Sequence, residues 1–141
     1  MNKVDLSVVI AYYNNKTILE CLMWLLAALK EVKKLNYEIL LVDDSSTYPL
    51  SEPVLNFMNE KKIKCLRKNK NSGVSEVRNS ALEITSGEII LIMDADCYVR
   101  RDYFKKLFEN FKKFKNCGMV FGKREPYFDE PFKRFRELKY R

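Results

Sequence analysis

The segment Glu88–Asp96 reads EIILIMDAD and decides the fold, because an apolar run passes directly into two acidic residues. Ile89–Met93 is apolar and rich in β-branched side chains, a pattern typical of a strand buried on both faces. Asp94 and Asp96 follow at once. We therefore expect a buried strand over Glu88–Met93 whose carboxyl end presents carboxylates.

The same pattern recurs on both sides of this segment. Further strands are predicted over Leu6–Ala11, Glu38–Asp43 and, more weakly, Ile63–Arg67, and Met119–Gly122 begins a fifth. Amphipathic stretches between them predict helices over Thr17–Lys34, from a Ser51 cap onward, over Val74–Thr85 with Ser86-Gly87 as a left-handed cap, and over Asp102–Lys115. Strand–helix alternation with apolar strands predicts an α/β fold, a doubly wound, mostly parallel sheet flanked by helices. The common strand order of such sheets is 3-2-1-4.

Composition is that of a globular domain. The chain has 141 residues, 47% of them hydrophobic and 32% charged, which excludes intrinsic disorder and disulfide scaffolds. No histidine occurs, so mechanisms that need an imidazole are excluded. Four cysteines without a C-x-x-C pair predict small core residues with reduced thiols rather than a zinc site. No apolar run approaches the roughly 20 residues that span a bilayer.

Acidic residues follow two of the predicted strands at the edge where ligands bind in doubly wound sheets. Asp43 and Asp44 end the second strand, and Asp94 and Asp96 end the fourth, so all four are expected to face one crevice. Carboxylates spaced as in Asp94-x-Asp96 suit Mn²⁺ or Mg²⁺, which also hold substrate phosphates. The alternative is that these acids only form turns and helix caps. Neither glycine-rich phosphate motif is present.

Four motifs together resemble the family 2 glycosyltransferases of the GT-A fold. They are SVVIAYYN (Ser7–Asn14), VDDSS (Val42–Ser46), NSGVSEVRN (Asn71–Asn79) and GEIILIMDAD (Gly87–Asp96), in the order and spacing of the family. The resemblance covers residues 5 to about 122. It implies that residues 1–122 form a donor domain that binds a nucleoside-diphosphate sugar, most simply a UDP-sugar.

The resemblance also assigns roles to single residues. Ala11 and Tyr13 match the motif that lines the nucleotide pocket, with Ala11 where the family usually has proline. Asp44 would hydrogen-bond the base, and Asp43 would support its loop. Arg78 would lie near the diphosphate.

On the same resemblance, Asp94 would contact the ribose or sugar and Asp96 would bind Mn²⁺ or Mg²⁺, with Asp94 as a second metal ligand. Glu20 occupies a position that is often acidic in the family. Packing or solvent-facing roles remain open for Tyr13, Arg78 and Glu20.

The implied reaction moves the sugar to an acceptor hydroxyl, usually with inversion at the anomeric carbon. The acceptor is a saccharide, a lipid-linked molecule or a protein. Inversion needs a general base, which must be an Asp or Glu in a chain without histidine. The catalytic base is not identified and is expected beyond Arg141, because Asp129 and Glu130 match no family motif. The fold is therefore expected to be truncated in its acceptor half.

The basic charge lies in the last part of the chain. Residues 1–100 carry 13 basic and 13 acidic side chains, whereas residues 101–141 carry 13 basic and 6 acidic ones, which accounts for the net charge of +7. Residues 123–141 are expected to start the acceptor half or to form an interfacial helix that contacts a membrane, and the location is expected to be cytoplasmic, at the membrane face. Nucleic-acid binding is not expected.

Other functions remain as alternatives. One is a non-catalytic nucleotide-binding fragment or remnant of a glycosyltransferase that docks on a partner or membrane. Nucleotidyl transfer is disfavoured because a glycine-rich basic loop after the first strand is missing. A phosphotransfer receiver is disfavoured because the paired acids follow the second strand rather than the first.

Overall fold

The computed structural model describes residues 3–114, 116–123 and 125. Its helices and strands are β1 (Leu6–Tyr12), α1 (Ile18–Leu29), β2 (Tyr37–Asp43), α2 (Glu52–Glu60), β3 (Lys64–Arg67), α3 (Val74–Leu82), β4 (Ile89–Asp94) and α4 (Tyr103–Lys113). The chain forms two compact units, Met1–Lys106 and Leu107–Arg141. All strands and the helices α1 to α3 belong to the first unit, which carries the site described below.

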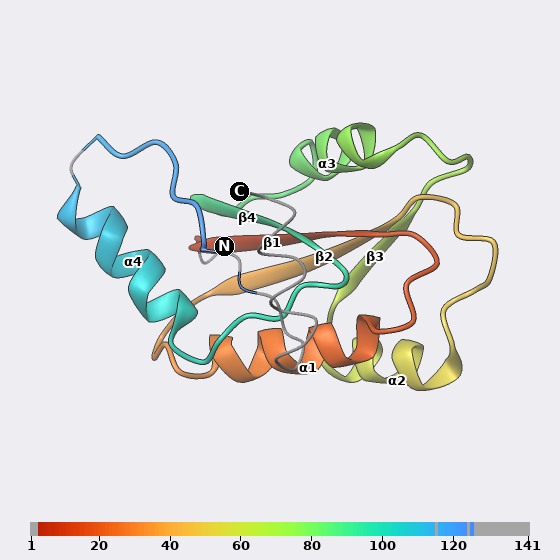
Figure 1. The fold of residues 1–141 in the computed structure, drawn as a ribbon, viewed down its shortest axis with the longest axis horizontal. Coiled ribbons are helices and arrows are strands. Elements are labelled where there is room, and N and C mark those ends of the chain that lie inside the picture. Colours follow the sequence, from red (N-terminus) through yellow and green to blue (C-terminus); the bar gives the residue numbers. More distant parts are fainter. Residues whose placement is uncertain (1–2, 115, 124, 126–141) are drawn as a thin grey trace, which may run out of the picture. The chain divides into compact units, whose positions relative to one another are not determined.

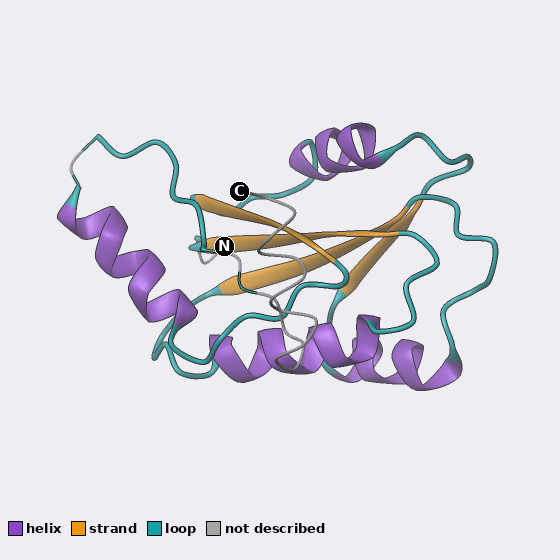
Figure 2. Cartoon of the chain, viewed as in Figure 1, coloured by secondary structure: helices purple, strands orange, loops and turns teal. Residues whose placement is uncertain are grey.

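The four strands form one parallel sheet in the order β3-β2-β1-β4, as predicted (Figure 1). Helices α1 and α2 run along one face of the sheet, and α3 lies on the other (Figure 2). The sheet is therefore doubly wound, and the carboxyl ends of its strands meet at one edge.

Both faces of β1 are buried, which explains its uninterrupted apolar sequence. Val9 packs in a cluster with Leu40, Val42, Val77 and Ala81, the last two from α3. Alternate residues of a strand point to opposite faces, so the fully buried Leu6, Val8 and Ile10 face the layer of α1 and α2. Two helical layers thus hold the central strand in place.

The amino ends of the strands are tied by a polar network around Glu38. Its Oε1 accepts hydrogen bonds from Ser7 Oγ at 2.7 Å and from the Ser86 amide at 2.8 Å, and Oε2 accepts one from Lys64 Nζ at 2.8 Å. The Gly87 amide donates to Ser7 Oγ at 2.8 Å. Burial opposes ionisation, but these donors lower the pKa of Glu38 to about 2.

Helix α1 is shorter than predicted, since it ends at Leu29 and not at Lys34. The amides of Glu31 and Val32 donate to the carbonyls of Ala28 and Leu29, three residues earlier, so the chain tightens out of α-helical geometry. Lys34 then adopts a left-handed backbone with φ of 61°. The hydrophobic pattern of the sequence does not indicate this change of backbone geometry, so it predicts a longer helix.

Helix α3 also ends early, at Leu82, and the predicted left-handed cap at Ser86-Gly87 is wrong. The capping residue Glu83 keeps a right-handed helical backbone, with φ of −66°. The amides of Ile84 and Thr85 both donate to the carbonyl of Ala81. Gly87 serves another purpose, because a Cβ there would lie 2.4 Å from the backbone nitrogen of Ser7.

Ser51 precedes α2 as predicted, but its side chain makes no capping hydrogen bond. Met119–Gly122 is not a strand in the structure. A strand needs a neighbour for its backbone hydrogen bonds, and a short apolar run alone does not supply one. The segment 123–141, expected to start the acceptor half or to form an interfacial helix, lies outside the described residues except for Lys123 and Glu125, and Asp129 and Glu130 lie outside them too.

Cysteine burial agrees with prediction only in part, since Cys21 is buried while Cys65 is exposed and Cys97 and Cys117 are half-buried. None of the four, all of which lie in the described part of the chain, forms a disulfide. Within the described part of the chain, no helix combines the length and the apolar character needed to cross a bilayer.

Candidate functional site

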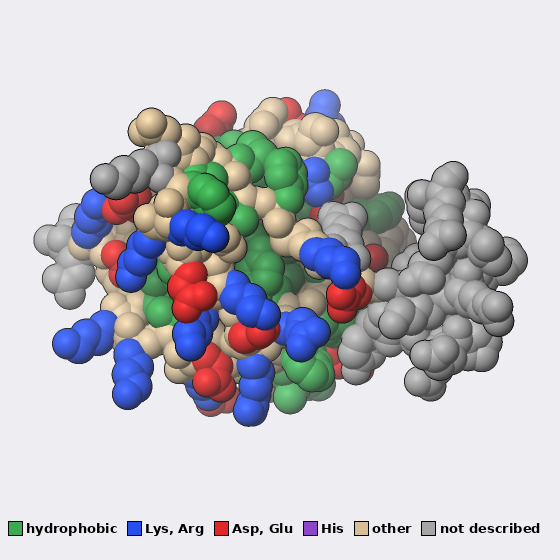
Figure 3. All heavy atoms as spheres, turned by 60° about the vertical axis from the view of Figure 1, so that its left-hand side comes forward, with side chains coloured by type: hydrophobic (Ala, Val, Ile, Leu, Met, Phe, Trp, Pro, Cys, Tyr) green, Lys and Arg blue, Asp and Glu red, His purple; other side chains and the backbone are tan. Residues whose placement is uncertain are grey.

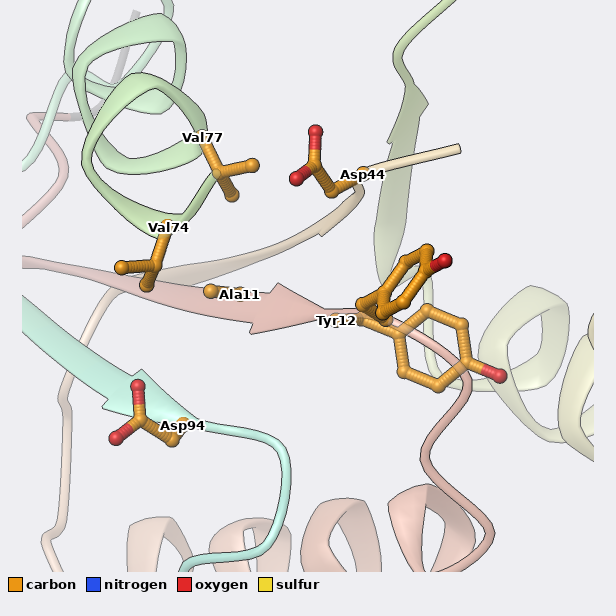
Figure 4. Close-up of a pocket in the computed structure, with 7 residues that line it drawn as sticks. Ala11, Tyr12, Asp44, Val74, Val77 and Asp94 are labelled. Atoms are coloured by element: carbon orange, nitrogen blue, oxygen red, sulfur yellow. The ribbon is translucent and has the colours of Figure 1, made fainter. Parts of the chain in front are cut away.

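An open pocket lies at the carboxyl edge of the sheet, with a cavity of about 140 Å³. Its lining residues are Ala11, Tyr12, Tyr13, Asp44, Val74, Val77 and Asp94. Figure 4 shows Asp44 and Asp94 on opposite sides of Ala11, with Val74 and Val77 coming from α3. The pocket therefore has a small apolar floor and one carboxylate at each side.

Asp44 is held by the backbone that precedes α3. Its Oδ1 accepts hydrogen bonds from the Ser72 amide at 2.8 Å and the Ser72 hydroxyl at 2.9 Å, and its Oδ2 accepts one from the Gly73 amide at 2.8 Å. Burial raises the pKa of Asp44, but these donors outweigh it and lower the pKa below its usual value. The carboxylate is therefore ionised at neutral pH and fixed in direction.

Gly73 makes this arrangement possible. Its φ of 84° lies in the left-handed region, which glycine enters at little cost. The turn allows successive amides to point at Asp44 and leads directly into α3 at Val74. The N-x-G pattern of the sequence is thus explained by a carboxylate on the neighbouring strand end.

Asp94 pairs with a cation from the same helix. Arg78 Nη2 lies 2.8 Å from Asp94 Oδ1, and both side chains are about one-third exposed. The buried Nε of Arg78 has no hydrogen-bond partner among the described residues. An unpaired buried donor is rare in folded proteins, so this atom favours an acceptor supplied by a ligand.

Asp96 lies in the turn after β4 and is exposed. One oxygen or sulfur atom from each of Asp94, Asp96 and Cys97 can be chosen so that all three lie within 4.8 Å of one another. Such a separation suits ligands of one cation, and carboxylate oxygens are the donors that Mg²⁺ and Mn²⁺ prefer. The donor set thus fits a hard divalent cation at Asp94 and Asp96.

The expectation that four acids face one crevice is wrong in part. Asp44 and Asp94 line the pocket, whereas Asp43 is buried in an ion pair with Arg67 and Asp96 is not among the lining residues. Tyr13 lines the pocket and is half exposed.

Glu20 does not line the pocket either. It is an exposed residue of α1, and its Oε2 accepts a hydrogen bond from Tyr98 at 3.1 Å.

The sequence alone did not reveal Ser72, Arg67 or Cys97 as parts of this region. Arg67 is the last residue of β3. Because the carboxyl ends of parallel strands meet at one edge of a sheet, its position at a strand end could have indicated that it lies near the site. Cys97 directly follows the D-A-D motif. Ser72 carried no signal, because its role depends on the direction of its backbone amide.

Fold and site together define a parallel α/β domain with a pocket at the carboxyl edge of its sheet, and comparison with known proteins identifies its family. The chain matches the Glycosyl transferase family 2 model over residues 7–140. It therefore belongs to the family 2 glycosyltransferases.

Two curated relatives show the extent of the similarity. The glycosyltransferase GlyG of Streptococcus pneumoniae is 29% identical over 119 residues, which cover 83% of this chain and 38% of GlyG. The poly(ribitol-phosphate) beta-glucosyltransferase of Bacillus spizizenii is 33% identical over 127 residues, covering 85% of this chain and 19% of that enzyme. The chain thus spans well under half the length of these relatives.

Solved structures of TarS from Staphylococcus aureus have the same fold. Residues 1–349 of TarS superpose with a TM-score of 0.66 at 30% identity, covering 78% of this chain and 33% of that one. The same fragment in complex with UDP-GlcNAc superposes with a TM-score of 0.64 at 28% identity and again covers 78% of this chain. A complex with UDP is also similar, with a TM-score of 0.61.

Proposed function

We propose that residues 1–122 form the donor-binding part of a glycosyltransferase that moves a sugar from a UDP-sugar to an acceptor hydroxyl with inversion. The observation that carries this proposal is the pocket at the carboxyl edge of the sheet, with Asp44 and Asp94 at its sides. The UDP and UDP-GlcNAc complexes of TarS support a uridine nucleotide as the ligand.

The pocket has separate places for the base and for the phosphates. Asp44 is an ionised acceptor of fixed direction, suited to the N–H of a uracil ring, and Tyr13 offers an exposed ring for stacking. Arg78 offers the diphosphate a guanidinium whose buried Nε lacks a partner among the described residues. Ala11, which lies between Asp44 and Asp94 in Figure 4, leaves room for the ligand because its side chain is a single methyl group.

Asp94 and Asp96 would hold the divalent cation, Mn²⁺ or Mg²⁺, with Cys97 beside them. Such a cation supplies Lewis-acid stabilisation of the charge on a leaving diphosphate. Arg78 already places one positive charge against Asp94, so the chain itself partly neutralises this acidic group before any ligand binds.

Inversion in one displacement requires a general base for the acceptor hydroxyl. Asp44 and Asp94 are engaged by Ser72, Gly73 and Arg78. We therefore assign the base to a carboxylate outside the donor pocket, and the acceptor to a saccharide, lipid-linked molecule or protein. In this proposal the donor pocket orients the sugar and the leaving group but does not deprotonate the acceptor.

Titration calorimetry with UDP tests the donor site and its metal dependence. The unaltered chain should bind UDP more tightly with Mn²⁺ than without it, because a cation at Asp96 screens diphosphate from carboxylate. The gain is the ratio of the UDP affinity with Mn²⁺ to the UDP affinity without it. Asp96→Asn should lower this ratio at least tenfold, since a neutral amide is a weaker ligand than a carboxylate.

Asp102→Asn is the matched control. It removes one acidic charge close in sequence, where the half-exposed Asp102 pairs with Lys106 at 2.6 Å. This variant should keep the full gain from Mn²⁺. Equal UDP affinity of the unaltered chain with and without Mn²⁺ would refute the metal-assisted site, and no binding of UDP at all would refute the donor site.

A further inference from the structure

The loop after β2 presents Asp44 to the pocket although it has no helix or strand of its own. Ser45, the next residue, adopts a left-handed backbone with φ of 60°. A residue with a Cβ is strained in this conformation. Surrounding contacts must therefore hold the loop in the shape that directs Asp44 at the pocket.

Arg67, the last residue of β3, makes these contacts from the neighbouring strand. Its Nη1 pairs with Asp43 Oδ2, and its Nη2 donates to the carbonyl of Ser46 at 2.8 Å. One planar guanidinium thus binds Asp43 and Ser46, the two loop residues that flank Asp44 and Ser45. Arginine suits this task because its donors are fixed in a fork.

Asp43 also stabilises this loop, from its buried side. Its Oδ1 accepts a hydrogen bond from the Ser46 amide at 2.9 Å, and its side chain is only 3% exposed. The Asp43 carbonyl accepts one from the Lys68 amide at 2.8 Å. Without Arg67, a nearly buried carboxylate would lose its charged partner, and the Ser46 carbonyl would lose a donor.

We propose that Arg67 is a positioning residue for nucleotide recognition, which fixes the 43–46 loop so that Asp44 meets the base of the bound nucleotide. Arg67 itself does not line the pocket. This inference rests on the proposed donor site and adds to it a residue that sets its preference for the base.

Lys64 provides a matched comparison within the same strand. It also forms one ion pair with a largely buried carboxylate, Glu38 at 2.8 Å, but that pair lies at the amino ends of the strands. Lys64→Met and Arg67→Met each remove one positive charge and one ion pair from β3. They differ in whether the pair reaches the loop that carries Asp44.

The test measures UDP and ADP affinities by calorimetry for the 141-residue chain and these variants. Arg67→Met should lower UDP affinity about five- to tenfold and reduce the preference for UDP over ADP by a similar factor. Lys64→Met should leave both quantities unchanged within twofold. Loss of base preference is decisive, because a merely structural role would not change the ratio of the two affinities.

Amide hydrogen exchange without nucleotide gives a second readout. Arg67→Met should speed exchange at the Ser46 amide at least tenfold, and Lys64→Met should not. Arg67→Lys serves if Arg67→Met fails to fold, because lysine keeps the charge beside Asp43 but lacks the fork that also reaches Ser46. It should show intermediate UDP preference.

A folded Arg67→Met variant with unaltered UDP preference would overturn the inference, as would unaltered preference in Arg67→Lys if only that variant folds. Failure of the unaltered chain to bind UDP would overturn the proposed donor site instead. In that case, an unchanged rate of amide hydrogen exchange at Ser46 in Arg67→Met would also contradict the positioning role.

Discussion

Four aspartates at one edge of the sheet have four different environments. Asp43 is buried against Arg67, Asp44 is bound by amides, Asp94 pairs with Arg78, and Asp96 is exposed. The same carboxylate group can therefore support a loop, accept from a base, or hold a cation, depending only on its neighbours. Residue type predicts the chemistry available, and neighbours decide which part of it is used.

Gly87 is a residue whose identity is set by a single close approach. A Cβ there would lie 2.4 Å from Ser7 N and 2.6 Å from Ser7 Oγ. Gly87→Ala should lower the free energy of unfolding by about 1–3 kcal/mol, because β1 must move to admit the methyl group. Urea denaturation followed by circular dichroism measures this change.

Gly118→Ala is the control for this substitution, since nothing lies within 4 Å of a Cβ at that position. It should change the free energy of unfolding by less than about 0.5 kcal/mol. A Gly87→Ala variant as stable as the unaltered chain would show that the backbone around Ser7 yields without cost.

At the scale of elements, α3 connects the two sides of the pocket. The turn before it donates two amides to Asp44, and the helix carries Arg78 to Asp94. Val77 on the same helix packs into the core beneath, so the helix is anchored to the sheet. The segment from Asn71 to Arg78 therefore contacts both aspartates and sets the distance between Asp44 and Asp94.

The Glu38 network at the opposite edge joins β1, β2 and β3 to the segment before β4, and it predicts a pH dependence of stability. The pKa of Glu38 is lowered to about 2 in the folded chain, against about 4.3 for an unfolded glutamate. Its contribution is therefore fully present above the unfolded pKa and is lost as the pH falls through the folded pKa. Glu38→Gln should cost about 1–2 kcal/mol at pH 7, allowing for screening by solvent around Lys64.

Urea denaturation at several pH values measures this difference. The gap in the free energy of unfolding between Glu38→Gln and the unaltered chain should shrink steadily from pH 5 to pH 2. Glu83→Gln is the control, because Glu83 is exposed after α3 and should show no such trend. A gap that stays constant over this range would contradict the lowered pKa.

At the scale of the whole molecule, the proposed site lies entirely in the unit Met1–Lys106. On the face shown in Figure 3, basic and acidic side chains intermingle, with hydrophobic patches between them. In the sequence, residues 1–100 carry 13 basic and 13 acidic side chains. We therefore expect the positive charge for a diphosphate to come from single residues such as Arg78 rather than from a broad basic surface.

Ligand binding to this unit should raise its unfolding temperature. UDP at a hundred times its Kd should add about 2.7 kcal/mol to the free energy of unfolding, because only the folded chain binds. Trp24, the single tryptophan, lies in α1 of this unit, so its fluorescence reports the transition. Asp44→Ala at the same UDP concentration should show less than half the shift, and an equal shift would exclude Asp44 from nucleotide binding.

The sequence by itself determined the alternation of strands and helices, the placement of four acids at the strand ends, and the family, because these follow from hydrophobic periodicity and from motifs local in the chain. The strand order agrees with the common order of doubly wound sheets, but hydrophobic periodicity alone does not determine it. It did not predict where α1 and α3 end, that Met119–Gly122 is not a strand, or that Asp43 turns to Arg67 while Asp44 turns to Ser72. Each of these depends on a partner distant in sequence or on the direction of one backbone amide. Only the tertiary structure brings such groups within hydrogen-bonding distance and so decides between them.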